Sequence, residues 1–508
     1  MKLNQNILAD YFQDGMVLPR NKEFYLGGKV ASESLVKISF NGKTTNVLSD
    51  DLGNWHLHVG AISNFNGEAE IKVMSNKHSQ VIKNLHLGKV YLLSGQSNIE
   101  YRLKDEADFS QVKKDLDNCK YQNLYYYNVP QIDFLDSKTG KILPKDLKEE
   151  TWHHVNSKNA GDMSAVGYYM LQKLSEINPH EPLAIVDCFK GGTSASVWID
   201  KRDLSSDPEL NEAFIKPYQK AIAGKTKKDF DQETKEYNLR VEKHNHDLNE
   251  YLRLHPDTTL SDAKNIVGHT PWPPPMRPEL FTRPAGLHQT MMDQIKYGSF
   301  NMLIWYQGEN DTDRAQYYHK LLPMLIFTWR KTLKDPSLPI KVIQLPGYAD
   351  YPQDSAALIR QVQLDTSRQL TNADLVSFVD GGEEHNIHPT HKKKMGRRLG
   401  SIVSGRNYLG SPYVDKVIQQ DKRILLHITR CESCKLSGKA TIKLIGGQQS
   451  RSYEVQESDL NKNYISIPLK INDLRQISYG YENYPQNIGL YNELDYPLSP
   501  FKIEVNNV

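Results

Sequence analysis

Five short apolar runs, each ending at or near a glycine, constrain the fold of this chain more than any other feature. Helix-like segments separate the runs, which are KVYLLSG, PLAIVDCFKGG, NMLIWYQGEN, IKVIQLPG and ADLVSFVDGG. Each run is nearly continuous rather than alternating, as expected of a parallel strand that is buried on both faces. Strands and helices that alternate in this way predict a doubly wound α/β sheet.

Shorter segments of a different pattern flank these runs on both sides. There, apolar and polar residues alternate between turn-forming clusters, which is typical of antiparallel strands with one buried face. A chain of 508 residues also exceeds the usual size of a single domain. We therefore expect a β-sandwich region at 1–88, an α/β domain at 89–405 with a charged helical insertion around 201–285, and a C-terminal β region at 406–508.

The composition argues against several classes of partner. The chain has 63 basic and 61 acidic residues, so no strong field draws it to nucleic acid or to an anionic membrane. No segment approaches the ~20 apolar residues of a membrane span, and the first residues lack the apolar core of a secretory signal. Four cysteines suit a reducing compartment. We expect a cytoplasmic protein with a small-molecule or glycan partner, or a secreted one whose signal has been removed.

Polar motifs follow four of the five apolar runs, where the loops of an open α/β sheet converge on one crevice. They are GQSN, KGGT, QGEND and NIHP. Each motif alone is more simply a turn or a capped loop. Together, in this order, they supply a serine nucleophile, oxyanion donors and an imidazole base, which is the set that acyl transfer requires.

The longer strings around these motifs resemble the blocks of SGNH hydrolases. GQSN, GGTSASVW, WYQGEND and IHPTHKKKMGRRL are similar to the sialate O-acetylesterase branch. Near the start, FQDGMVLPR and DDLGNWHLHV resemble that branch's N-terminal β domain, and ISYGYENYPQNIGLYNELDYPLSPFKI resembles its closing segment. The resemblance implies an SGNH (flavodoxin-like), three-layer, parallel-sheet hydrolase domain flanked by β-sandwich regions.

The resemblance also implies roles for four residues. Ser97 matches the nucleophile and His388 the general base. The N–H groups of Ser97 and Gly192 and the side-chain amide of Asn310 match the oxyanion hole. These residues imply hydrolysis of carbohydrate O-acetyl esters through an acyl-enzyme, with no metal or organic cofactor.

The acid of a Ser-His-acid triad stays open at this stage. Many relatives carry it two or three positions before the histidine, where this chain has Asn386 and His385. Either Glu383, Glu384 or Asp380 orients the imidazole, or a backbone carbonyl does so in a Ser–His dyad.

Four further residues are candidate ligands of the substrate. Gln96 and Gln307 could hydrogen-bond a sugar, Trp198 could stack on it, and Arg283 could pair with the carboxylate of a sialic acid. For Trp198 the alternative is packing under the site, and for Arg283 an ordinary surface position. The basic residues from Lys392 to Arg398 lie at helical spacing and predict a solvated helix face.

The leading functional hypothesis is a serine esterase that acts on O-acetylated sialic acid. The alternatives are an esterase for acetylxylan or another acetylated glycan, and a general short-chain carboxylesterase. A hypothesis of another class is a non-catalytic carbohydrate-binding protein with a degenerate hydrolase core.

Overall fold

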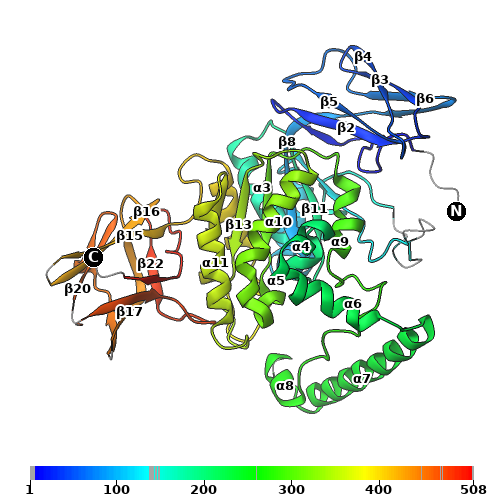
Figure 1. Cartoon of the computed structure of the whole chain (residues 1–508). Coiled ribbons are helices and arrows are strands. Elements are labelled where there is room, and N and C mark those ends of the chain that lie inside the picture. Colours follow the sequence, from blue (N-terminus) through cyan, green and yellow to red (C-terminus); the bar gives the residue numbers. More distant parts are fainter. Residues whose placement is uncertain are drawn as a thin grey trace. The chain divides into compact units, whose positions relative to one another are not determined.

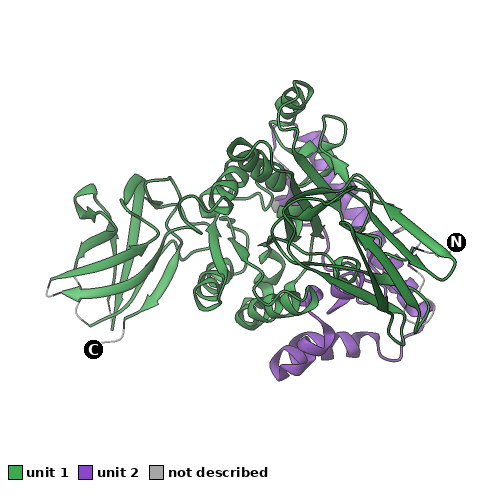
Figure 2. Ribbon diagram, turned by 90° about the horizontal axis from the view of Figure 1, so that it is seen from above, with its two compact units in different colours: residues 1–131, 148–195, 291–508 green, residues 132–147, 196–290 purple. Residues whose placement is uncertain are grey.

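A computed structural model describes most of the chain (Figure 1). The described residues are 6–136, 142–143, 146, 149–258, 260–420, 422–447, 449–469, 471 and 473–505. They form two compact units (Figure 2): unit 1 contains residues 1–131, 148–195 and 291–508, and unit 2 contains residues 132–147 and 196–290.

A mainly parallel sheet lies at the centre of unit 1. Its strands follow one another in the order β10-β9-β11-β8-β12-β13-β14, with only the β10–β9 pair antiparallel, and β1 pairs with the start of β8. The bounds are β1 Val17–Pro19, β8 His86–Gly95, β9 Leu124–Asn128, β10 His153–His154, β11 Leu183–Phe189, β12 Met302–Tyr306, β13 Ile340–Gln344 and β14 Ala373–Ser377. Every residue of β11 and β13 is buried. The parallel α/β sheet predicted from the apolar runs is confirmed.

The chain reverses its direction of travel across the sheet at β8. It goes from β8 to β9 and β11 on one side, and then to β12, β13 and β14 on the other. In open α/β sheets such a reversal opens a crevice at the carboxyl ends of the strands. β8 and β12 approach closely there, because a Cβ at Gly95 would lie only 1.9 Å from the carbonyl oxygen of Tyr306.

Helices of unit 1 pack in pairs around this sheet. α12 (Lys393–Val403) lies against α3 (Ala165–Ile177). α11 (Ser355–Gln369) lies against β13 (Figure 1), and also against α10 (Tyr318–Thr332) and β14. Glycine explains the close fit of the first pair. A Cβ at Gly396 or at Gly400 would lie 2.7 Å from a backbone carbonyl oxygen of α3, so larger residues there would push the helices apart.

Antiparallel sheets make up the rest of unit 1, as the alternating patterns predicted. Near the start, β2 (Phe24–Lys29) pairs with β5 (Asn54–Val59), and a second sheet has the order β4-β3-β6-β7. Its strands are β3 Leu35–Phe40, β4 Lys43–Leu48, β6 Ile71–Ser75 and β7 His78–Ile82. The strands near the end are β15 Tyr413–Gln420, β16 Arg423–Thr429, β17 Lys435–Gly446, β18 Ser450–Glu454, β19 Leu460–Asn461, β20 Tyr464–Pro468, β21 Leu474–Tyr479, β22 Ile488–Tyr491 and β23 Phe501–Glu504. The domain boundaries at residues 88 and 405 stay predictions.

Unit 2 contains the whole segment, 201–285, that we expected to be a helical insertion. Its helices include α4 Lys201–Ser206, α6 Lys216–Ile222, α7 Lys227–Leu254, α8 Leu260–Val267 and α9 Gly286–Thr290. α7 starts with a capping box between Thr226 and Asp229, and its buried residues are Phe230 and Leu248. Across the part of the chain that is described, none of the helices has both the length and the apolar character needed to cross a membrane.

Candidate active site

Ser97 and His388 meet at the carboxyl end of the central sheet. Ser97 begins the short helix α1 (Ser97–Glu100) directly after β8, and His388 lies between β14 and α12. The Nε2 atom of His388 lies 2.8 Å from the Oγ atom of Ser97, although the residues are 291 positions apart. This distance suits transfer of the hydroxyl proton to the imidazole. The structure therefore brings the two central residues of the sequence prediction together.

The loop after β11 passes directly beside Ser97. A Cβ at Gly191 would lie 3.4 Å from the Cβ of Ser97, and the N–H of Gly191 donates to the carboxylate of Glu100. Gly192 has a φ of 68°, a left-handed conformation that favours glycine. Because the carboxylate of Glu100 already accepts from Gly191, the next N–H, that of Gly192, is the candidate oxyanion donor of this loop.

Asn310 lies in the 3-10 helix η7 (Glu309–Tyr317) after β12 and is hydrogen-bonded to the loop that carries Ser97. Its backbone N–H donates to the Oε1 atom of the buried Gln96 at 3.1 Å. Its side-chain amide makes no hydrogen bond to the described part of the chain, so that amide is available to a ligand. Gln96 thus links the loops that carry Ser97 and Asn310, and its predicted contact with substrate stays a prediction.

Gln307 is fully buried and joins two loops in a similar way. Its Nε2 atom donates to the carbonyl of Thr193 at 3.1 Å and to the carboxylate of Asp311 at 2.7 Å. Asp311 also accepts from the Ser194 hydroxyl and the Ala195 N–H. These bonds hold the loop after β11 against the loop after β12. The predicted contact of Gln307 with substrate stays a prediction.

Asn98, Glu309 and Lys392 form a buried network that the sequence reasoning missed. The Nδ2 atom of Asn98 donates to Glu309 Oε1 at 2.6 Å and to the carbonyl of Ile387 at 2.9 Å. The Nζ atom of Lys392 donates to Asn98 Oδ1 at 2.7 Å. Burial lowers the pKa of Lys392 to about 7, and burial raises the pKa of Glu309. Asn98 belongs to the motif GQSN and Glu309 to the motif QGEND. Their place in these motifs was the one sequence signal that could have revealed the network.

The prediction of a solvated basic helix face is wrong for two of its residues. Lys392 is 0% exposed and Arg398 is 6% exposed. Arg398 forms a bidentate ion pair with Asp380. The pattern of charges did not indicate that Lys392 and Arg398 are buried, because their partners come from distant parts of the chain or from the preceding loop.

The three candidate acids all contact groups other than the imidazole of His388. Glu383 accepts from the Thr390 N–H at 2.9 Å and from Asn386 Nδ2 at 2.8 Å. Glu384 lies 3.9 Å from the ring of His385. The role of an acid in orienting His388 stays a prediction.

Asp380 is held by Arg398 and by Lys394. Burial alone would raise its pKa, but these hydrogen bonds and charges outweigh burial and hold the pKa below its ordinary range. Asp380 is therefore a stably ionised partner of α12.

Trp198 and Arg283 belong to unit 2, where both are buried. Trp198 is 0% exposed, which fits the alternative of packing. The guanidinium of Arg283 donates to the carbonyls of Leu280 and Asp133 and lies over the ring of Phe134, 5.3 Å from its centroid. Arg283 is therefore no ordinary surface residue. Substrate binding by either residue stays a prediction.

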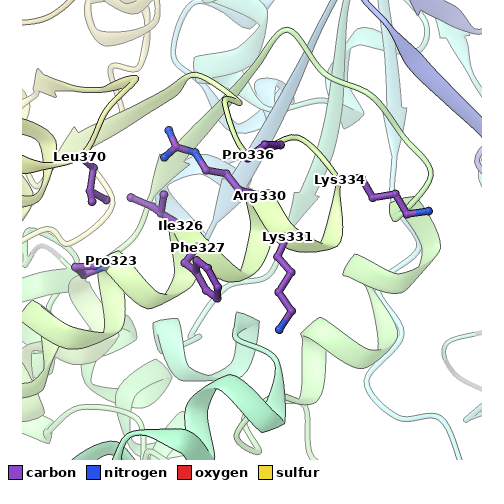
Figure 3. A pocket seen from close by; sticks show the side chains of 8 residues that line it. All are labelled: Pro323, Ile326, Phe327, Arg330, Lys331, Lys334, Pro336 and Leu370. Carbon is purple, nitrogen blue, oxygen red and sulfur yellow. The ribbon is translucent and has the colours of Figure 1, made fainter. Parts of the chain in front are cut away.

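No cluster of metal-binding side chains forms among the described residues, and a pocket along α10 does not include the predicted site residues. No group of three or more histidine, cysteine, aspartate or glutamate side chains comes together among them in a way that could hold a metal ion. A surface pocket of about 480 Å³ lies along α10 (Figure 3), where Ile326, Phe327, Arg330 and Leu370 are among its lining residues. None of the predicted site residues lines that pocket.

Comparison with known proteins gives the family. Residues 279–404 match the family described as "Carbohydrate esterase, sialic acid-specific acetylesterase". The matched segment is thus that of a carbohydrate esterase. The matched segment of this esterase includes Asn310 and His388, and the suspected family is thereby confirmed. No match was found among proteins with curated descriptions.

A solved structure extends the likeness of the esterase to nearly its whole length. A carbohydrate acetylesterase from Xanthomonas citri is 20% identical, with 98% of this chain and 99% of that chain covered and a TM-score of 0.71. Two other solved structures are less similar. A protein from Arabidopsis thaliana is 14% identical, with 63% of this chain and 98% of that chain covered and a TM-score of 0.32. An acetyl xylan esterase from the rumen bacterium Butyrivibrio proteoclasticus is 9% identical, with 76% of this chain and 87% of that chain covered and a TM-score of 0.25. The Xanthomonas structure shows that this chain shares the mixed α/β fold with added antiparallel sheets of that acetylesterase.

Proposed function

We propose that this esterase removes acetyl groups from carbohydrate hydroxyls, with Ser97 as nucleophile and His388 as general base. The observation that carries the proposal is the 2.8 Å contact between Ser97 Oγ and His388 Nε2 at the carboxyl end of the parallel sheet. A degenerate, carbohydrate-binding core would have no need of this contact, so it favours catalysis over the binding hypothesis.

The reaction follows from the chemistry of these groups. Neutral His388 takes the proton of the Ser97 hydroxyl as the oxygen attacks the acetyl carbon. The N–H groups of Ser97 and Gly192 and the amide of Asn310 stabilise the oxyanion. His388 then gives the proton to the departing sugar oxygen. In the second half, a water that His388 deprotonates attacks the acetyl-enzyme, and acetate leaves as the Ser97 hydroxyl reforms. No step calls for a metal or an organic cofactor.

We further propose that the catalytic part is an SGNH (flavodoxin-like), three-layer hydrolase domain. The strand order around β8 and the pairs of helices α3–α12 and α10–α11 support this assignment. The position of the candidate residues after β8, β11, β12 and β14 agrees with the general rule for open α/β sheets.

We propose O-acetylated sialic acid, free or in an oligosaccharide, as the first substrate to test. The support is the description of the matched family as sialic acid-specific. Acetylxylan or another acetylated glycan is the second candidate, because the Xanthomonas relative is described only as a carbohydrate acetylesterase.

The test is acetate release from a panel of O-acetylated sialic acids and xylo-oligosaccharides. We expect Ser97→Ala and His388→Ala each to lower kcat by about 10³-fold or more, because the two residues act as a unit. Ser63→Ala and His78→Ala, at exposed positions, are matched controls that should keep the parental rate. Full activity of Ser97→Ala would refute the catalytic proposal, and the sugar class that releases acetate identifies the substrate.

A further inference from the structure

The buried carboxamide of Asn98 connects three of the four loops at the candidate site. Asn98 directly follows Ser97, Glu309 directly precedes Asn310, and Ile387 directly precedes His388. The Nδ2 atom of Asn98 reaches both Glu309 Oε1 and the carbonyl oxygen of Ile387, at 2.6 and 2.9 Å. One side chain thus touches a neighbour of each proposed catalytic or oxyanion residue on the loops after β8, β12 and β14.

The two charged partners fix the orientation of this carboxamide. A carboxylate only accepts hydrogen bonds and an ammonium only donates them. Glu309 therefore requires the NH₂ group of Asn98 on its side, and Lys392, 2.7 Å from Oδ1, requires the oxygen on the other side. Rotating the amide by 180° would place NH₂ against ammonium and oxygen against carboxylate. While both groups are charged they exclude that rotation, so the second hydrogen of Nδ2 is directed at Ile387.

Burial makes these requirements strict. Asn98 and Lys392 are 0% exposed and Glu309 is 5% exposed. The Nζ atom of Lys392 also lies 5.0 Å from the centre of the Tyr101 ring. A polar group at such depth costs free energy when its hydrogen bond is lost, because water cannot take the place of the lost partner without a penalty.

We propose that Asn98 is a positioning residue, which holds the backbone of Ile387 so that the imidazole of His388 stays within hydrogen-bond reach of Ser97. Glu309 and Lys392 serve this function by fixing the amide of Asn98. The proposal rests on the proposed roles of Ser97 and His388. A displacement of about 1 Å between reacting groups can cost roughly 10²-fold in rate, so one buried bond beside His388 is sufficient to matter.

The test uses a substitution that changes one atom's hydrogen-bonding character. Asn98→Asp keeps the shape of the side chain and the bond from Lys392, but it places an acceptor against both Glu309 and the carbonyl of Ile387. We expect kcat for acetate release to fall roughly 10- to 100-fold, with KM within about twofold of the parent. Labelling of Ser97 by a serine-reactive phosphonate should slow by a similar factor. Asn118→Asp, an exposed position, is the matched control and should keep the parental values.

A double variant separates positioning from a merely structural role. Glu309→Gln in the Asn98→Asp background gives the new carboxylate a donor again, but it leaves Ile387 without its bond. We expect the melting temperature to recover most of its loss while kcat stays low. If kcat recovers together with the melting temperature, or if Asn98→Asp has the parental kcat, the positioning role is overturned.

Two outcomes of the same experiment keep the proposals apart. If Asn98→Asp fails to fold, Lys392→Met is the replacement variant, because it frees the amide to rotate without changing Asn98. Parental kcat in a folded Lys392→Met protein would overturn the proposal.

If the parent and Asn118→Asp release no acetate and Ser97 is not labelled, the proposed function itself fails. An active parent with an unaffected Asn98→Asp variant would remove the positioning role alone.

Discussion

Glu383 ties together the short loop that presents His388. Its Oε1 atom accepts from the N–H of Thr390, and its Oε2 atom accepts from the Nδ2 atom of Asn386. Asn386 in turn accepts from the N–H of His388 at 3.1 Å. Residues on both sides of the imidazole therefore depend on one carboxylate, whether or not an acid orients the ring itself.

Glu383→Ala should lower kcat roughly tenfold, because the loop loses the three hydrogen bonds that Glu383 accepts from Thr390 and Asn386, and His388 loses its fixed distance to Ser97. Glu383→Gln retains a carbonyl oxygen that accepts from Thr390, so it should recover at least half of the loss. Steady-state acetate release at saturating substrate measures both. Equal loss in the two variants would instead point to the charge of Glu383, as expected of a triad acid.

Residues whose chemistry is unusual at their position were the ones that the sequence singled out most clearly. A serine and a histidine at the ends of buried strands are informative, and the structure places them 2.8 Å apart. Lys392 was misjudged because a lysine within a basic run is normally solvated, and only the fold reveals that Asn98 and Glu309 surround it. The hydrogen bonds of Gln96 and Gln307 to other loops could not be predicted, because they join residues far apart in the sequence.

At the scale of elements, the end of β8 is shaped by the absence of a side chain at Gly95. Its φ of 140° is accessible mainly to glycine, and a Cβ would collide with the carbonyl of Tyr306 on β12. The same residue ends the strand that leads into Ser97. Sequence patterns predicted β8 and β12 as strands, but how closely they approach follows from three-dimensional packing.

Gly95→Ala should therefore destabilise the protein by about 3 kcal/mol or more, since both the backbone conformation and the strand spacing must change. Gly60→Ala is the matched control, because a Cβ there meets no atom within 4 Å. Urea unfolding followed by tryptophan fluorescence compares the two. Similar midpoints for both variants would show that β8 can shift away from β12 at little cost.

At the scale of the whole molecule, Arg360 joins α11 to the segment that follows β21. Its guanidinium is fully buried and donates to the carbonyls of Pro346, Glu482 and Asn483. Asn483 also donates its Nδ2 to the carbonyls of Tyr351 and Pro352. The parallel sheet with its helices and the C-terminal segment are thus linked by polar bonds that no local pattern could predict.

Arg360→Met should cost about 3 kcal/mol or more of unfolding free energy, because buried carbonyls lose their donor. Arg368→Met, on the exposed part of the same helix, removes a cation beside Tyr413 and should cost less than about 1 kcal/mol. Denaturant midpoints of the two variants and the parent test this difference. A loss below 1 kcal/mol in Arg360→Met would mean that the C-terminal segment contributes little to stability.

The pH dependence of stability should carry a contribution from Asp187. Burial raises its pKa to about 7, while the charge of Arg102 opposes the shift. The folded state therefore retains the proton that the unfolded chain loses near pH 4. The stabilisation is complete below about pH 4 and is lost as the pH rises through 7.

Asp187→Asn removes this titration and keeps an acceptor for the N–H of Ser164. Relative to the parent, the variant should gain up to about 4 kcal/mol between pH 4 and pH 8. Urea unfolding at both pH values provides the comparison, with the other titrating groups common to both proteins. A constant difference in stability across that range would contradict the raised pKa.

The separation of 291 residues between Ser97 and His388 also sets when activity can first appear during synthesis. At ~5–20 residues per second, the histidine is added roughly 15–60 seconds after the serine. The segment that Arg360 binds is made later still, near residue 483. A nascent chain thus carries its proposed nucleophile without its proposed base until residue 388 has been added.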